Sequence, residues 1–115
     1  MITVDAAMIG TCVRITCTGF YGVGSEGNPS GHLVKDAIKR FMDCDGDRPS
    51  EVLIDFSGVE YVWGDGPGWS VMPWARQLNV TYLVSDRNEQ ALRGLFSATN
   101  LDKVLKITIT RVDAA

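Results

Sequence analysis

Two glycine-rich segments carry the residue spacings that could do chemistry in this chain. In the first, Gly22, Gly24 and Gly27 formally match the G-x-G-x-x-G pattern of dinucleotide-binding loops. That pattern binds a pyrophosphate only where its first glycine ends a strand and its third lies inside the next helix. Here Asn28 and Pro29 follow directly, and proline at a first helical position predicts that the helix only begins there. Because no acidic residue ends a second strand about twenty residues further on, where a ribose would need it, the pattern favours a flexible glycine loop.

The second glycine-rich segment follows an apolar run and precedes an apolar helix face. Gly64, Gly66 and Gly68 alternate there with Asp65 and Pro67, which indicates a turn whose backbone lies close to another group. A strand that leads into a glycine loop and a helix is a common location of binding sites in α/β folds. If the backbone amides of both glycine segments converged on one pocket, they could hold the anionic part of a small ligand or nucleotide.

Side chains arranged for catalysis or for metal binding are scarce. Ser70 lies one glycine short of a nucleophile elbow, and its base would have to be His32, the only histidine, from the start of another helix. Asp43, Asp45 and Asp47 alternate, but the glycine and the glutamate of a calcium-binding loop are missing from their required places. We therefore expect a protein that is not an enzyme and that has no metal ion and no cofactor.

Three tryptophans gather around the second glycine segment. Trp63, Trp69 and Trp74 fall within twelve residues. Packing in the core accounts for one or two of them, whereas a third that is exposed beside a glycine loop would be an interaction hot spot, because tryptophan anchors many protein interfaces. The segment therefore predicts a surface for a protein partner.

The composition indicates one cytoplasmic domain that binds neither nucleic acid nor membranes. Residues 1–115 have the length of a single domain. A net charge of −3, from 14 acidic and 11 basic residues, argues against a nucleic-acid surface, since such surfaces gather Lys and Arg. The first residues show no signal-peptide pattern, and no run approaches the ~18 apolar residues of a membrane span.

The cysteines Cys12, Cys17 and Cys44 are odd in number and lack C-x-x-C spacing. That pattern suits neither a disulfide framework nor a zinc site. We expect small buried side chains in a reducing compartment.

Hydrophobic periodicity predicts the elements that must position these segments. The predicted strands are 2–7, 12–18, 52–56, 80–84 and 104–110, and the predicted helices are 30–44, about 68–77 and one that opens at 86–89. Pro73 should bend or shorten the second helix. Asp86 and Glu89 form a capping box for the third helix, with Ser85 as a rival cap. The segment from 19 to 31 is predicted to be the longest irregular stretch.

The order of these elements predicts the fold class. The first two strands should form a hairpin that turns near Gly10 and occupies an edge of the sheet. The run 52–54 is apolar enough for a buried central strand. Alternating strands and helices then imply right-handed crossovers. We therefore expect an α/β fold with a mixed, largely parallel sheet opened by an N-terminal β-hairpin, in the order ββαβαβαβ.

This order and several local sequences resemble the STAS domain, the fold of bacterial anti-sigma-factor antagonists and of sulfate-transporter cytoplasmic tails. Residues 52–59 (VLIDFSGV) are similar to the family's ILDLSGV strand, and residues 66–68 (GPG) are similar to its GLG. Residues 95–101 (LFSATNL), followed by 104–107 (VLKI), are similar to its closing L..TGL...F.I pattern. The resemblance covers nearly the whole chain.

The regulatory loop of the family differs in this chain. Phosphoregulated members read Asp-Ser-Ser/Thr-Gly there, and the first serine takes the phosphate. With Gly66 aligned, those places hold Trp63, Gly64 and Asp65. Gly64 has no hydroxyl, so the family's serine switch cannot operate at that position. Asp65 adds a permanent negative charge beside a helix N-terminus, where it either mimics a modified state or, as we favour, caps the helix.

The resemblance implies a non-catalytic regulatory module that binds a protein partner, such as an anti-sigma-factor-like kinase or another regulator. The predicted partner-binding residues are Trp63, Gly64, Asp65, Gly66, Gly68, Trp69 and Trp74. The alternative is a small-ligand or nucleotide-binding domain, with Gly22, Gly24 and Gly27 joining the second loop as an anion cradle. A third option is an adaptor whose role is homo-oligomerisation through the edge hairpin, for example as a homodimer.

Overall fold

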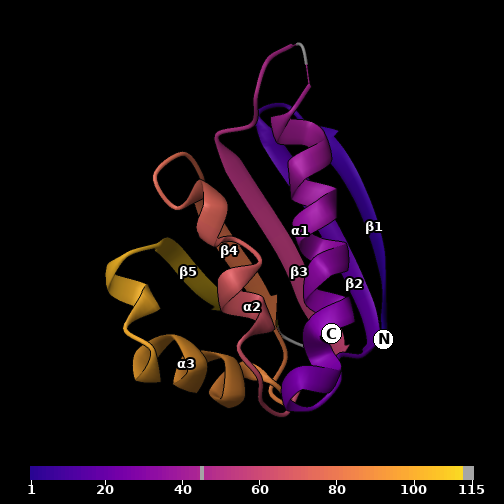
Figure 1. The fold of residues 1–115 in the computed structure, drawn as a ribbon, viewed down its shortest axis with the longest axis vertical. Coiled ribbons are helices and arrows are strands. Elements are labelled where there is room, and N and C mark those ends of the chain that lie inside the picture. Colours follow the sequence, from indigo (N-terminus) through magenta and orange to yellow (C-terminus); the bar gives the residue numbers. More distant parts are fainter. Residues whose placement is uncertain (45, 113–115) are drawn as a thin grey trace.

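Five strands form one sheet, and their order in space repeats their order in the chain (Figure 1). The computed structural model describes residues 1–44 and 46–112. Its strands are β1 (Ile2–Ile9), β2 (Cys12–Phe20), β3 (Glu51–Glu60), β4 (Asn79–Val84) and β5 (Lys106–Arg111). β1 is antiparallel to β2, and each later pair is parallel. The predicted mixed, largely parallel sheet with an edge hairpin and a central β3 is therefore confirmed.

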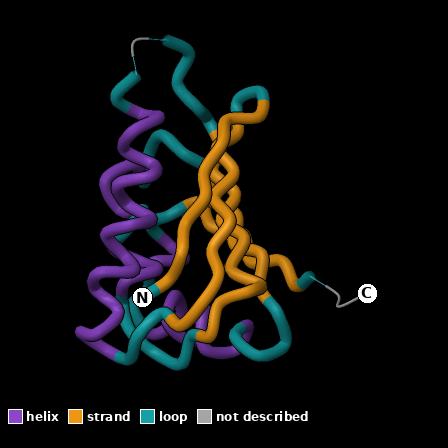
Figure 2. The backbone as a smooth tube through the Cα atoms, turned by 90° about the vertical axis from the view of Figure 1, so that its right-hand side faces the viewer, coloured by secondary structure: helices purple, strands orange, loops and turns teal. Residues whose placement is uncertain are grey.

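The helices all lie on one face of the sheet (Figure 2). They are α1 (Asn28–Met42), α2 (Gly66–Trp69) and α3 (Glu89–Ala98), with the 3-10 turns η1 (Gly24–Gly27), η2 (Met72–Trp74) and η3 (Leu101–Lys103). Each parallel connection moves one strand further in the same direction, and right-handed connections of that kind place their helices on the same face. Within residues 1–44 and 46–112, none of the helices has the length and apolar character needed to cross a membrane.

The hairpin turns at Gly10, as predicted. Ile9 pairs with Cys12 across a two-residue turn, and Gly10 has a φ of 62°. A positive φ at the first turn residue is the geometry that a tight hairpin prefers, and glycine adopts it without strain. Because so tight a turn lets pairing begin at once, β1 continues to Ile9, beyond its predicted end at residue 7. β2 begins at Cys12 as predicted and is longer at its other end, where it reaches Phe20.

The glycine-rich segment 19–31 is mostly regular, which contradicts the prediction of a long irregular stretch. The end of β2, η1 and the start of α1 occupy most of it. Gly22 and Gly24 have φ values of 105° and 58°, which let the chain reverse between β2 and η1. The Tyr21 N–H donates to the Glu60 carbonyl at 3.0 Å, which ties the segment to the end of β3.

β3 extends to Glu60, beyond its predicted end at Phe56. A register shift against β2 marks an irregularity in this part of the strand. The buried Asn88 amide donates to the carbonyls of Phe56 and Val59, at 2.8 Å each. These bonds satisfy one strand carbonyl within the irregularity and one just after it, and they support the continuation of β3 to Glu60.

α3 begins at Glu89, and the predicted capping box is wrong. Asn88 occupies the N-cap position, and neither Asp86 nor Ser85 does. The Asn88 side chain makes no capping bond, because its amide nitrogen is used on β3 and its Oδ1 accepts from the Ser85 N–H at 3.0 Å. A side chain required for a tertiary contact thus replaces the local capping pattern.

The helix predicted over 68–77 is present only as two short turns. α2 comprises four residues, and η2 comprises three. Pro73 lies in the first turn of η2, where its missing N–H costs no helical hydrogen bond. The predicted shortening by proline is therefore confirmed, and the break is sharper than expected.

Five aromatic rings that contact one another fill the core near the carboxyl ends of the parallel strands. Neighbouring ring centroids lie 5.5 to 5.9 Å apart, the range of favourable edge and tilted contacts. The rings are those of Tyr21, Phe56, Tyr61, Tyr82 and Phe96, all of them buried. This rigid layer supports the loops that follow β2 and β3.

Only one of the three cysteines fits the prediction of small buried side chains. Cys17 is buried, Cys12 is half-buried and Cys44 is exposed. Burial, with a smaller effect of Asp55, raises the pKa of the Cys17 thiol to about 12, so it carries almost no thiolate at neutral pH.

We expect a thiol-alkylating reagent to modify Cys44 rapidly in the folded protein and to leave Cys17 unmodified. Mass spectrometry of alkylated peptides measures both sites in one sample, and the same reagent in denaturant provides the reference for complete reaction. Equal modification of Cys17 and Cys44 under native conditions would contradict the burial described above.

Candidate functional site

A cavity of about 690 Å³ opens where three parts of the chain meet. One wall comes from η1 and the start of α1, the second from the loop after β3, and the third from α3, all at the lower end of the molecule in Figure 1. Its lining residues are Gly24, Ser25, Asn28, Tyr61, Trp63, Gly64, Asp65, Ala91, Gly94 and Leu95. We call this the loop cavity. Both glycine segments contribute to it.

The two glycine segments contact each other directly at the rim of the loop cavity. The Gly24 N–H donates to the Trp63 carbonyl at 3.2 Å. A Cβ at Gly24 would lie 2.7 Å from the Trp63 ring, so only glycine allows the indole to lie this close. The Tyr61 hydroxyl donates to the Gly64 carbonyl, which fixes the loop from below. The Trp63 ring is thus positioned by its neighbours and still 60% exposed.

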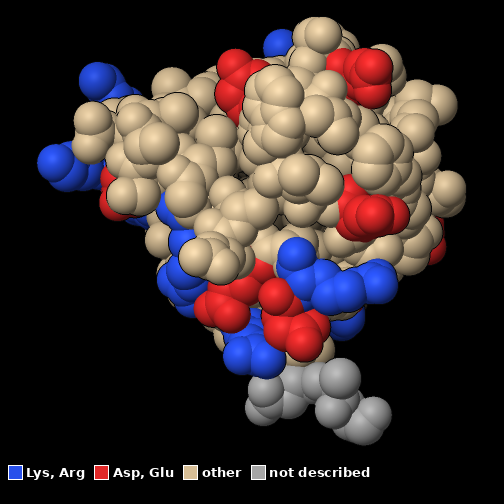
Figure 3. All heavy atoms as spheres, turned by 90° about the horizontal axis from the view of Figure 1, so that it is seen from below, with Lys and Arg blue, Asp and Glu red and all other residues tan. Residues whose placement is uncertain are grey.

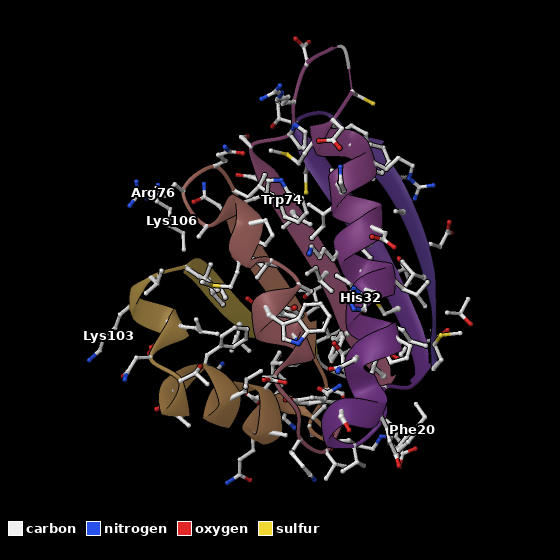
Figure 4. All side chains as sticks on the ribbon, viewed as in Figure 1. Phe20, His32, Trp74, Arg76, Lys103 and Lys106 are labelled. Atoms are coloured by element: carbon white, nitrogen blue, oxygen red, sulfur yellow. The ribbon has the colours of Figure 1, made fainter. Side chains whose placement is uncertain are left out.

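The other two tryptophans are half-buried. The Trp69 ring packs on the His32 ring with a centroid distance of 4.9 Å, and Trp74 packs against the core. In Figure 4, His32 projects from α1, and Trp74 lies between α1 and the chain that follows α2. Of the three tryptophans, Trp63 offers the largest free surface.

The remaining predicted glycines lie inside the protein and position the loops. Gly66 and Gly68 are buried, and a Cβ on Gly66 would lie 2.2 Å from the Tyr21 hydroxyl. Gly22 and Gly27 are also buried. Of Gly22, Gly24 and Gly27, only Gly24 lines the loop cavity, where Gly64 of the second loop joins it.

Asp65 does not cap α2 with its side chain, which corrects the favoured interpretation. It occupies the N-cap position, but only its backbone carbonyl is used, accepting from the N–H groups of Gly68 and Trp69 at 3.0 and 3.1 Å. Among the described residues, its exposed carboxylate forms no ion pair. Burial, together with this negative charge, raises the pKa of Tyr61 to about 12. The loop cavity therefore has a free negative charge at its rim.

A second, smaller cavity of about 310 Å³ adjoins the loop cavity. The two share Asn28 and Asp65, and the smaller one also includes His32, Lys35 and Trp69. Figure 4 shows Arg76, Lys103 and Lys106 at the opposite margin of the molecule from α1. Among the residues that line these two cavities, Lys35 is the one Lys or Arg.

Ser70, the residue nearest to a nucleophile elbow in the sequence, does not line the loop cavity. Ser70 is 1% exposed, and its Oγ donates to the Pro67 carbonyl at 3.5 Å. Within residues 1–44 and 46–112, no three His, Cys, Asp or Glu side chains gather to hold a metal ion. Asp45, the middle residue of the Asp43–Asp47 series, lies outside the described residues.

Sequence reasoning missed the wall that α3 contributes. Ala91 and Leu95 are half-buried on α3, and both line the loop cavity. Gly94 stands between them, and a Cβ there would meet no atom within 4 Å. Gly94 was the signal in the sequence that could have identified this wall, because a glycine inside a predicted helix often marks a packing or functional position.

Comparison with known proteins gives a structural likeness alone. No protein-family model and no curated protein matches this sequence. An anti-sigma factor antagonist from Mycobacterium paratuberculosis has a similar structure, with a TM-score of 0.60 and 14% sequence identity. The likeness covers 93% of this chain and 85% of that chain. The chain therefore has the fold of an anti-sigma factor antagonist, as its STAS-like sequence features imply.

Proposed function

We propose that this protein is a non-catalytic regulatory module that binds a protein partner at the loop cavity. The observation that carries the proposal is Trp63, which stands 60% exposed at the rim of a mostly apolar cavity. Exposed tryptophans beside a pocket commonly anchor protein interfaces. The fold likeness to an anti-sigma factor antagonist supports a regulatory role of this kind.

The lining of the loop cavity favours an apolar side chain of the partner. Tyr61, Trp63, Ala91 and Leu95 supply its apolar and aromatic side chains, and Asp65 supplies a charge. Its volume of about 690 Å³ is sufficient for one or two large side chains. Figure 3 views this end of the molecule and shows a broad uncharged area, with acidic and basic side chains mainly around it. We infer a partner segment with an apolar anchor and a neighbouring positive charge that faces Asp65.

We also propose that binding does not depend on serine phosphorylation within the loop. No Ser or Thr lies between Ser57 and Ser70. The free Asp65 carboxylate gives the loop a constant charge in place of a reversible one.

One observation favours the alternative of a small-ligand domain. Gly24 and Gly64, one from each glycine segment, line the same cavity, as an anion cradle would require. Against a phosphate-bearing ligand stands Asp65, whose carboxylate would repel it. Tryptophan fluorescence, titrated with inorganic phosphate and with nucleotides, separates the two functions. A saturable shift would favour the alternative, and no shift is expected from the proposed function.

A capture experiment with three variants tests partner binding. Trp63→Ala removes the anchor, and Gly94→Leu fills the loop cavity from α3, where a side chain has free space. Val104→Ala is the matched control, because Val104 is 59% exposed and lies outside the cavity. Each purified variant is incubated with an extract of the cells that naturally make this protein. Quantitative mass spectrometry then compares the proteins that each variant retains.

We expect at least one protein to be retained by the wild type and by Val104→Ala and to be reduced about tenfold or more by both cavity variants. Loss of a hot-spot tryptophan costs about 2 kcal/mol or more, which corresponds to such a reduction. Partners that bind Trp63→Ala and Gly94→Leu as well as they bind the wild type would contradict the proposal.

A further inference from the structure

β1 is an unprotected edge of the sheet. It pairs with β2 from Ile2 to Ile9, and the sheet ends at β1 (Figure 1). Natural edge strands are usually short, bulged, or interrupted by lysine or proline, because an open edge pairs readily with another strand. β1 has eight residues, regular pairing, neither lysine nor proline, and Asp5 as its one charged residue.

The pairing pattern shows which backbone groups face outward. A two-residue hairpin turn makes Ile9 and Cys12 a hydrogen-bonded pair, and such pairs alternate along antiparallel strands. The N–H and C=O groups of Val4, Ala6 and Met8 therefore point away from β2. In agreement, the N–H of Ile2, which has the same orientation, donates to the Ser30 Oγ of α1 at 3.2 Å.

A groove accompanies this open edge. Its volume is about 320 Å³, and it lies between β1 and α1. Val4, Leu33 and Ala37 supply its apolar lining, and Asp36 and Arg40 supply one charge of each sign. A groove between an edge strand and a helix is the setting in which an added strand places its alternate side chains. We call this the edge groove.

We propose that β1 pairs antiparallel with β1 of a second copy of this chain, about a two-fold axis at Ala6. In this register Val4 lies opposite Met8 of the second copy, and each outward-facing residue exchanges backbone hydrogen bonds with its counterpart. The two sheets become one continuous sheet, and the same surface is used by both copies, as a two-fold interface requires. None of these residues lines the loop cavity, so the inference goes beyond the proposed function.

Charged side chains on the face of the sheet that carries no helices favour this register over its neighbours. Ala7 pairs with Arg14 of β2, and it lies opposite Asp5 of the second copy. The small Ala7 side chain leaves room for Arg14 to reach that carboxylate. Asp5 and Arg14 are exposed, and neither forms an ion pair among the described residues. Because of the two-fold axis, this ion pair forms twice, each time between Arg14 of one copy and Asp5 of the other.

Neighbouring registers place like charges together. An axis at Asp5 puts the two Asp5 side chains directly opposite, which is unfavourable. An axis at Ala7 brings the two Arg14 side chains toward each other across small alanines. In the edge groove, the axis at Ala6 directs Asp36 of one copy toward Arg40 of the other, because α1 runs alongside β1 and is reversed in the second copy.

Charge reversal tests the proposed dimer. Asp5→Arg and Arg14→Asp each replace an attraction by a repulsion, and the double variant restores opposite charges. Thr108→Arg, at an exposed position of the opposite edge strand β5, is the control. Sedimentation velocity measures the dissociation constant at low salt over a wide range of protein concentration, and circular dichroism checks that each variant is folded.

We expect the wild type, Thr108→Arg and the double variant to sediment as dimers of the 12.6 kDa chain. Each single variant should dimerise about tenfold more weakly or not at all. Hydrogen exchange at the amides of Val4, Ala6 and Met8 should slow as the protein concentration rises. A wild-type monomer at all concentrations, a dimer that the single reversals do not weaken, or exchange that is independent of concentration would overturn the proposal.

Discussion

Replacing Gly22, which is buried, by alanine should lower the free energy of unfolding by about 3 kcal/mol, more than replacement of an exposed glycine would. Gly22 has a φ of 105°, which side chains rarely adopt. A Cβ there would lie 2.5 Å from the Glu26 carbonyl oxygen and 2.7 Å from the Gly27 nitrogen. Both atoms belong to the backbone of η1, which cannot move aside without breaking the turn into α1. Urea unfolding followed by circular dichroism measures the effect.

Two other glycines separate backbone strain from steric clash. Gly10 has a φ of 62° but free space around its Cβ position, so Gly10→Ala should cost only about 1 kcal/mol. Gly94 lies in α3 with free space as well, so Gly94→Ala should be neutral or stabilise the protein by up to about 1 kcal/mol. If Gly22→Ala unfolded at the same urea concentration as Gly10→Ala, the close packing of η1 on Gly22 would be refuted.

The second large effect concerns Asn88, which connects α3 to β3. Asn88→Ala removes two buried hydrogen bonds of 2.8 Å and leaves the carbonyls of Phe56 and Val59 without partners. Unsatisfied buried polar groups are costly, so we expect a loss of about 2 to 4 kcal/mol in the free energy of unfolding. Chemical denaturation gives the value, and hydrogen exchange should show α3 opening more often than the rest of the protein.

Asn79→Ala is the matched control for Asn88→Ala. Asn79 is exposed at the start of β4, and no side-chain hydrogen bond of Asn79 occurs among the described residues. Its replacement should change stability by no more than about 0.5 kcal/mol. A loss below about 1 kcal/mol for Asn88→Ala would show that Asn88 does not hold α3 in place.

The order of the elements could be predicted because it depends on local periodicity. Alternating residues such as Val13, Ile15 and Cys17 mark a half-buried strand, and the repeat of strand and helix determines the parallel connections. Element ends were less predictable, because tertiary contacts fix them. Asn88 extends β3 and delays α3, and neither effect is visible in a window of neighbouring residues.

The loop with Trp63, Gly64 and Asp65 was identified from its composition, and the structure places these three residues together at the loop cavity. Their role in partner binding stays a prediction. The convergence of Gly24 on the same cavity depends on how the end of β2 meets the end of β3, a contact between residues far apart in the chain. The position of the Asp65 side chain could not be predicted either, because α2 is too short and too close to the core to require a side-chain cap.

The most direct test of partner binding at the loop cavity is photo-cross-linking in the cells that make this protein. A photoreactive residue replaces Val62, which is 54% exposed and precedes Trp63, or Val104 as the control at a distant exposed position. We predict a protein adduct from position 62 that is absent from position 104 and that disappears when Trp63→Ala is added. No protein adduct at position 62, or the same adduct from both positions, would contradict partner binding at the loop cavity.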